Sequence, residues 1–90
     1  MKNAVYLYFA DAMLTNGSYE DLRKLGIEPR EGMQLTFYDL DGDDQNRPTY
    51  LCAEGTLYQV HGKTSAWYAE IDETSLRSIL RSEVDDPILS

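Results

Sequence analysis

Four aspartates and a glycine are crowded into the middle of the chain: Asp39, Asp41, Gly42, Asp43 and Asp44. Carboxylate oxygens are the ligands that calcium prefers, and the first three of these aspartates have the one-three-five spacing of a calcium-binding loop. Such a stretch is either a cation site or an acidic loop that is simply exposed to water.

The rest of the calcium-loop pattern does not match. Its sixth position requires glycine and holds Asp44, its eighth requires an apolar residue and holds Asn46, and its twelfth requires glutamate and holds Tyr50. Aspartate and glycine are also common turn formers, for reasons unrelated to metal binding. The pattern therefore favours a solvated hairpin loop, and a looser calcium site over residues 39–44 is the alternative.

Alternating residues in three segments predict a sheet face that carries tyrosines. Six apolar residues are expected to point inward: Leu35, Phe37, Leu51, Trp67, Ala69 and Ile71. The predicted binding face holds Tyr38, Tyr50, Tyr58 and Tyr68, with Glu54 and Glu70 nearby. Tyr58 belongs to it only if a bulge or bend expected at Gly55 keeps the alternation in phase.

Tyrosine combines apolar area with a hydroxyl at low entropic cost, so it is frequent in interfaces. Carboxylates beside such rings suit a partner that carries arginine or lysine. The alternative is that a helix covers this face, or that the tyrosines form ordinary cross-strand pairs.

No combination of residues in the sequence predicts catalysis. His61 is the single histidine and lies in a predicted turn beside Gly62, whereas Cys52 lies on a predicted strand with no assignable base. Glu54 and Glu70 lie on strands that could be neighbours, but nothing around them predicts a pocket that would separate their pKa values. Nucleophile-elbow and phosphate-binding glycine motifs are missing. We therefore expect a non-catalytic protein.

The chain is strongly acidic, with 16 carboxylates against 8 lysines and arginines and a formal net charge of −8. Nucleic acids and anionic membranes both require a basic surface, which this composition does not provide. A cation or a basic protein is the partner that the charge favours, through long-range steering; the alternative is that the charge only keeps a small protein soluble. The sequence thus predicts a small acidic interaction or regulatory protein that binds a protein partner, and an exposed aromatic face is equally compatible with a homodimer.

Ninety residues, of which 42% are hydrophobic and 27% charged, predict a single folded domain over residues 1–90. The acidic segment 84–90 is expected to be a loose tail. One cysteine excludes an intrachain disulfide, and the short apolar run near the N-terminus is interrupted by tyrosines, unlike a signal peptide. Because no stretch approaches the roughly 20 apolar residues that span a bilayer, the sequence predicts a cytoplasmic protein.

Hydrophobic periodicity predicts strands over residues 4–9, 33–38, 49–60 and 66–71. For the first segment the alternative is a helix that reaches Leu14, because residues 10–14 have better helix propensity. Helices are expected over residues 18–25 and 74–83. In the first, Ser18 suits the N-cap, Glu20 and Asp21 lie in the first turn, and Gly26 ends the helix. The second has an apolar stripe at helical spacing, formed by Leu76, Ile79 and Leu80.

Short connections between the predicted strands favour antiparallel pairing over a parallel sheet. We therefore expect an α+β fold, in which a strongly bent antiparallel sheet or an SH3-like small barrel of four or five strands carries one inserted helix and one closing helix. The sequence motifs of SH3 domains are missing, so no family is inferred.

Overall fold

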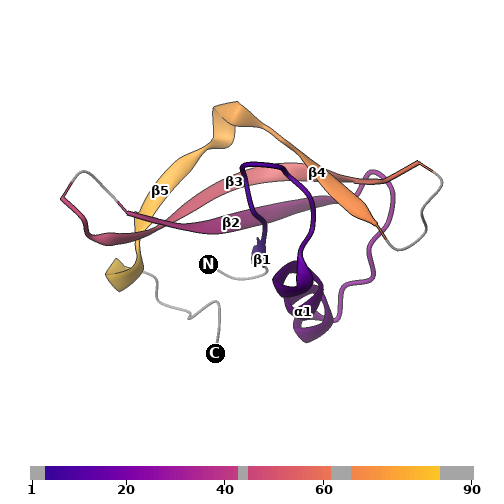
Figure 1. Ribbon diagram of the computed structural model, residues 1–90, viewed down its shortest axis with the longest axis horizontal. Helices are drawn as coiled ribbons and strands as arrows, with labels where there is room; N and C mark the ends of the chain where they lie inside the picture. The colour runs from indigo at the N-terminus through magenta and orange to yellow at the C-terminus, as the bar shows by residue number, and fades with distance from the viewer. Residues whose placement is uncertain (1–3, 43–44, 62–65, 84–90) are drawn as a thin grey trace.

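The computed structural model describes residues 4–42, 45–61 and 66–83, which form an open five-stranded sheet with one α-helix (Figure 1). The elements follow one another as β1 (Ala4–Tyr6), α1 (Asn16–Leu25), β2 (Gln34–Gly42), β3 (Pro48–Gln59), β4 (Trp67–Ile71), the 3₁₀ turn η1 (Glu73–Ser75), β5 (Arg77–Leu80) and the 3₁₀ turn η2 (Arg81–Glu83). The predicted α+β class is confirmed. The predicted acidic tail, residues 84–90, lies outside the described residues.

The long strands β2 and β3 form an antiparallel hairpin that spans the molecule, and every other strand pairs with one of them (Figure 1). On the far edge of β3, β4 pairs with the C-terminal half and β5 with the N-terminal half. Strand β1 pairs with β2 in parallel, so the expectation of a wholly antiparallel sheet is wrong. The reason is that α1 lies between β1 and β2 in the chain and supplies the crossover that parallel pairing requires.

The sheet stays open, so the predicted SH3-like barrel is not formed. The chain after β1 crosses to the outer edge of β4, where Ala69 N donates a 2.8 Å hydrogen bond to the carbonyl of Ala12. This contact amounts to one isolated bridge, between Met13 and Tyr68. A bridge of this length covers the edge of β4 without adding the further strand that would close a barrel.

Helix α1 begins two residues earlier than predicted, because Thr15 and not Ser18 is its N-cap. The Thr15 hydroxyl accepts a hydrogen bond from Ser18 N, and the Ser18 hydroxyl accepts one of 2.9 Å from Thr15 N. This reciprocal arrangement is a capping box. Gly26 ends the helix as predicted, with a φ of 69° that glycine adopts without strain.

The predicted C-terminal helix over residues 74–83 is wrong, and a strand between two 3₁₀ turns takes its place. Strand β5 pairs with residues 49–52 of β3, a stretch of edge that β4 leaves open. Pairing there satisfies backbone groups of both strands and packs Ile79 against a buried cluster. The stabilisation from this pairing and packing outweighs the preference for a helix that the spacing of the apolar residues indicates.

Two apolar clusters lie on opposite faces of the sheet. The larger cluster contains Val5, Leu7, Leu14, Leu22, Phe37, Leu57 and Ala69, and the smaller contains Ala4, Tyr38 and Cys52. Alternation along β2 assigns Phe37 to the first cluster and Tyr38 to the second. The second cluster is the one that faces the predicted binding surface.

No bulge occurs at Gly55, because the pairing register runs unbroken through it, to Leu35 on one side and to Ile71 on the other. A Cβ atom at this position would lie 3.0 Å from the ring of Phe37 and from Ile71 Cδ1. The glycine therefore permits close packing of these side chains. The alternation of β3 is not shifted, and Tyr58 keeps its place on the face predicted for it.

Candidate functional site

The pairing register places the predicted tyrosines on one side of the sheet, which we call the tyrosine face. Its members are Tyr38 of β2, Tyr50, Glu54, Thr56 and Tyr58 of β3, and Tyr68 and Glu70 of β4. Burial divides the face into a closed half around Tyr38 and an open half around Tyr68.

In the closed half, Tyr38 is completely buried, which corrects the expectation that its side chain points into solvent. Edge-to-face contacts join its ring to Tyr6, at 5.8 Å between centroids, and to Tyr50, at 5.7 Å. Its hydroxyl donates a 2.7 Å hydrogen bond to the carboxylate of Asp21 in α1. The packing of α1 beside β1 thus closes this half, and Tyr38 cannot touch a partner in the folded protein.

Asp21 is a buried carboxylate whose role the sequence does not reveal. It is 4% exposed, and the oxygen that bonds Tyr38 also accepts a 3.0 Å hydrogen bond from Tyr6 N. Because Tyr6 lies on an edge strand, Asp21 satisfies a backbone group that would otherwise require another strand. Burial first, and then this carboxylate, raise the pKa of Tyr38 well above its ordinary value. The signal in the sequence was an acidic residue directly beside the core residue Leu22.

In the open half, the rings of Tyr58 and Tyr68 stack, with centroids 5.6 Å apart and planes inclined by 30°. Tyr68 is 38% exposed and Tyr58 is partly exposed. Helix α1 packs against β1, the strand at the other end of the sheet order. The stacked pair therefore presents aromatic surface to solvent.

A groove of about 460 Å³ lies on the same face, next to the stacked pair. It is lined chiefly by Gln34, Thr36, Glu54, Thr56, Glu70 and Asp72. Thr56 lies opposite Glu70 in the register, and the next pair on the same face is Tyr58 with Tyr68. The groove thus joins hydroxyls and carboxylates to the exposed aromatic surface.

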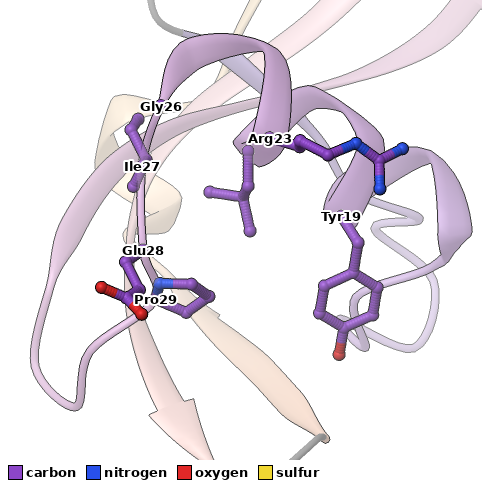
Figure 2. A pocket seen from close by; sticks show the side chains of 7 residues that line it. Tyr19, Arg23, Gly26, Ile27, Glu28 and Pro29 are labelled. Atoms are coloured by element: carbon purple, nitrogen blue, oxygen red, sulfur yellow. The ribbon is translucent and has the colours of Figure 1, made fainter.

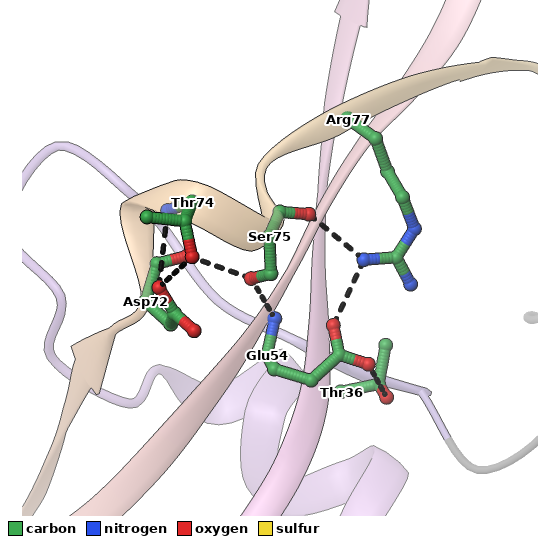
Figure 3. A network of polar contacts seen from close by, with 6 residues as sticks. All are labelled: Thr36, Glu54, Asp72, Thr74, Ser75 and Arg77. Carbon is green, nitrogen blue, oxygen red and sulfur yellow. Dashed lines mark hydrogen bonds and ion pairs between the residues drawn. The ribbon is translucent and has the colours of Figure 1, made fainter.

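Asp72 leads from the groove into η1, and this turn is fastened to β3 (Figure 3). The Ser75 hydroxyl accepts a 2.8 Å hydrogen bond from Glu54 N and donates one of 2.6 Å to the Asp72 carbonyl. Asp72 N donates to the Glu54 carbonyl at 2.9 Å, and Asp72 Oδ1 accepts from Thr74 N at 3.0 Å. Both backbone polar groups of Glu54 are satisfied, so the turn holds one side of the groove in place.

Glu54 is well connected within the groove. Its Oε2 accepts a 2.8 Å hydrogen bond from Arg77 Nη1, and its Oε1 accepts one of 3.1 Å from the Thr36 hydroxyl (Figure 3). The pKa of Glu54 is lowered, above all by the hydrogen bond from Arg77, with burial opposing the shift and Thr36 adding to it. The side-chain carboxylate of Glu70, by contrast, makes no hydrogen bond or ion pair with any residue that the structure describes.

The sequence suggests that the acidic residues 39–44 form a loop, but part of this stretch belongs to a strand. Strand β2 continues to Gly42, and its register pairs Asp41 with Thr49 of β3. Pairing along this hairpin extends the strand through aspartates that have a low intrinsic preference for strands. Asp43 and Asp44 lie outside the described residues.

Asp39 uses its carboxylate to satisfy backbone groups. Its Oδ2 accepts a 3.2 Å hydrogen bond from Phe9 N, and its Oδ1 accepts one of 2.8 Å from Leu40 N. Over residues 4–42, 45–61 and 66–83, no three aspartate, glutamate, histidine or cysteine side chains are grouped so as to hold a metal ion. Asp39 and Asp41 therefore give the predicted calcium site no support, and for residues 39–44 as a whole it stays a prediction.

A second hollow, of about 410 Å³, lies at the C-terminal end of α1 and is not anticipated from the sequence (Figure 2). It is lined largely by Tyr19, Leu22, Arg23, Ile27 and Pro29. Arg23 pairs with Glu20 on the surface of the helix. The lining thus offers apolar contact, and it contains no pairing of a nucleophile with a base.

Cys52 and His61, the two residues considered for nucleophilic chemistry, differ in exposure. Cys52 is completely buried, whereas His61 is exposed. Burial raises the pKa of the Cys52 thiol. Because the thiolate is the reactive form, this environment makes the thiol a poor nucleophile at neutral pH.

Comparison with known proteins gave no match: no family model, no curated protein and no solved structure matches this chain. Its function must therefore be inferred from the tyrosine face and the groove themselves. In the part of the chain that the structure describes, no helix is long and apolar enough to cross a membrane.

Proposed function

We propose that this protein is a non-catalytic interaction protein that binds a protein partner through the open half of its tyrosine face. The observation that carries the proposal is the stacked pair of Tyr58 and Tyr68, which exposes aromatic surface beside the carboxylate of Glu70. Rigid aromatic rings contribute large contact area at low entropic cost, and they dominate the energy of many interfaces.

The charge of the chain supports a basic partner. A formal net charge of −8 would accelerate the encounter with a positively charged surface, and this acceleration would weaken as salt is added. In its specific form, the proposal is that the protein regulates or inhibits a basic partner by covering its surface. Cys52 is the single cysteine of the chain and is buried, which is compatible with the reducing cytoplasm, the compartment that we propose.

Site-specific photocrosslinking tests this proposal directly. A photoreactive phenylalanine derivative at Tyr68 is expected to crosslink a protein in lysate of the source cells, and the same substitution at Tyr8 is the matched control. Both residues are exposed aromatics, at 38% and 49%, and Tyr8 follows β1 outside the tyrosine face.

The crosslinked protein is then purified and its affinity measured by calorimetry. Tyr68→Ala should weaken binding at least about tenfold, as for a central aromatic contact, whereas Tyr8→Ala should leave it unchanged. Equal crosslinking from both positions would refute the proposal. Crosslinking to a second copy of the chain, with a matching dimer in light scattering, would replace the partner with self-association.

A further inference from the structure

We propose that the groove in the open half of the tyrosine face receives an arginine side chain from the protein partner. This inference rests on the proposed function and specifies the chemistry of the segment that binds. Three features carry the inference: the groove in the sheet face, the negative charge of that face, and the stacked tyrosines beside the groove. Together they favour an arginine side chain.

The carboxylates of Glu54, Glu70 and Asp72 lie close together on this face, although Glu54 is distant in the sequence from the other two. Asp72 lies opposite Glu54, since Asp72 N donates to the Glu54 carbonyl at 2.9 Å. Glu70 lies opposite Thr56, two residues along β3 from Glu54. Opposite residues have Cβ atoms about 5 Å apart and diagonal ones about 7–8 Å, so the three carboxylates share one electrostatic environment.

Among the described residues, the cation that lies against these carboxylates is Arg77, which bonds Glu54. Asp72 accepts hydrogen bonds from Thr74 with one oxygen, and these bonds add no positive charge. Like charges on neighbouring strands destabilise a sheet. A cation supplied by the partner would reduce this repulsion, so the face is electrostatically complementary to a positive side chain.

A metal ion is a poorer fit than an organic cation, because the carboxylates do not converge on one point. No three of them are grouped so as to hold an ion within the described ranges. The groove, at about 460 Å³, also falls within the range of roughly 300–1,000 Å³ typical of small-molecule sites. It has room for an extended side chain.

Arginine fits the lining better than lysine. Its planar guanidinium presents five N–H donors in a fixed arrangement, and it stacks on aromatic rings. The groove offers acceptors of two kinds, the carboxylate of Glu70 and the hydroxyls of Thr36 and Thr56, and Tyr58 is the next residue of β3 on the same face. A lysine ammonium would satisfy fewer of these acceptors at once.

A titration with a defined peptide tests the inference without knowledge of the partner. The probe is acetyl-Gly-Arg-Gly-Arg-Gly-amide, added to the ¹⁵N-labelled full chain at low salt. The comparison peptides carry citrulline, a neutral isostere of arginine, or lysine in place of arginine. We expect amide shifts centred on Thr36, Thr56 and Glu70, an affinity for the lysine peptide several-fold lower, and no measurable binding of the citrulline peptide.

Glu70→Gln should weaken binding of the arginine peptide at least about fivefold, since it removes the carboxylate that bonds no described residue. Glu28→Gln is the matched control, because it makes the same change of charge at an exposed residue beside the other hollow. Unchanged thermal melting of both variants establishes that they are folded.

Equal binding of the arginine and citrulline peptides, shifts confined to another surface, or equal effects of the two glutamate substitutions would each overturn the inference. These outcomes are separable from failure of the proposed function. A partner captured through Tyr68 that binds Glu70→Gln as tightly as the parent protein would leave the proposed function intact and refute the arginine contact.

Discussion

The hydroxyl of Tyr38 donates a 2.7 Å hydrogen bond to the carboxylate of Asp21, and this bond joins the helix to the second strand beside the edge of the sheet. Both side chains are buried, and Asp21 also accepts the backbone N–H of Tyr6. The arrangement explains why one half of the tyrosine face is closed. It also identifies a residue whose loss should be costly.

Asp21→Ala should destabilise the protein by about 3 kcal/mol, because it leaves two donors, the buried Tyr38 hydroxyl and the partly buried Tyr6 N–H, without this acceptor. Urea denaturation measures the change. Glu20→Ala is the matched control, since Glu20 is an exposed acidic neighbour in the same helix. A loss no larger than that of Glu20→Ala would show that Asp21 contributes little. A double-mutant cycle with Tyr38→Phe would isolate the energy of the hydrogen bond between the two side chains.

Stability should fall with increasing pH in the alkaline range. The pKa of Tyr38 is raised from the value of 10.0 that it has without the fold, and that of Tyr6 is raised too, by burial first and then by Asp39. Above pH 10 the unfolded chain loses these protons while the folded chain retains them, so unfolding becomes more favourable. The stabilisation is complete below that pH and is lost above it.

Thermal melting between pH 8 and pH 12 tests this dependence. Tyr38→Phe should flatten the decline above pH 10, and Tyr8→Phe, at an exposed position, should leave it unchanged. If the decline is the same in both variants, Tyr38 is not its source.

Arg77→Gln should raise the pKa of Glu54 towards its ordinary value, because the hydrogen bond from Arg77 is the main cause of the lowered pKa. The Glu54 carboxyl carbon, followed by NMR during acid titration, reports the change. Because the pKa of Glu54 is lower in the folded protein than in the unfolded chain, the contact stabilises the fold at pH values above the unfolded-state pKa. This stabilisation is lost as the pH falls through the folded-state pKa.

Since both partners of this contact are about half exposed, the stability change should stay below about 1 kcal/mol. Arg23→Gln, which breaks the exposed pair with Glu20, is the control and should leave the Glu54 titration unaltered. A Glu54 titration that is identical in parent protein and Arg77→Gln would contradict the assignment.

Gly55→Ala should destabilise the protein by about 1–3 kcal/mol, because its Cβ would meet the Phe37 ring and Ile71 Cδ1 at 3.0 Å. Gly42→Ala is the control in a neighbouring strand, where the nearest atom to the new Cβ lies at 3.8 Å. Chemical denaturation of both variants compares them. Equal stabilities would mean that the side chains around Gly55 relax without cost.

Much of the sheet is predictable because alternation is a local property. Leu35, Phe37 and Tyr38 take the faces that their spacing assigns, and the stretch after the acidic residues is a strand as expected. The helix is also present near its predicted position, although Thr15 rather than Ser18 begins it. In each case a few neighbouring residues determine the outcome.

The predictions from sequence fail for segments whose structure depends on contacts with residues that are distant in the chain. The spacing of Leu76, Ile79 and Leu80 suits a helix, yet an open stretch of β3 draws this segment into a strand. The burial of Tyr38 depends on how α1 packs beside β1, and hydrophobic periodicity in the sequence does not predict such packing. The groove likewise depends on η1 folding back to Glu54, through a hydrogen bond between Glu54 and Ser75, which are 21 positions apart.

The bridge between residues 12–14 and β4 has a consequence for how another molecule can approach. An uncovered strand edge invites addition of a further strand, which is one route to peptide capture and also to aggregation. Here the protein's own chain occupies that edge beside Tyr68 and shields it. A partner or a neighbouring copy that meets this end of the molecule must therefore contact side chains on the face of the sheet, rather than add a strand at the edge of β4.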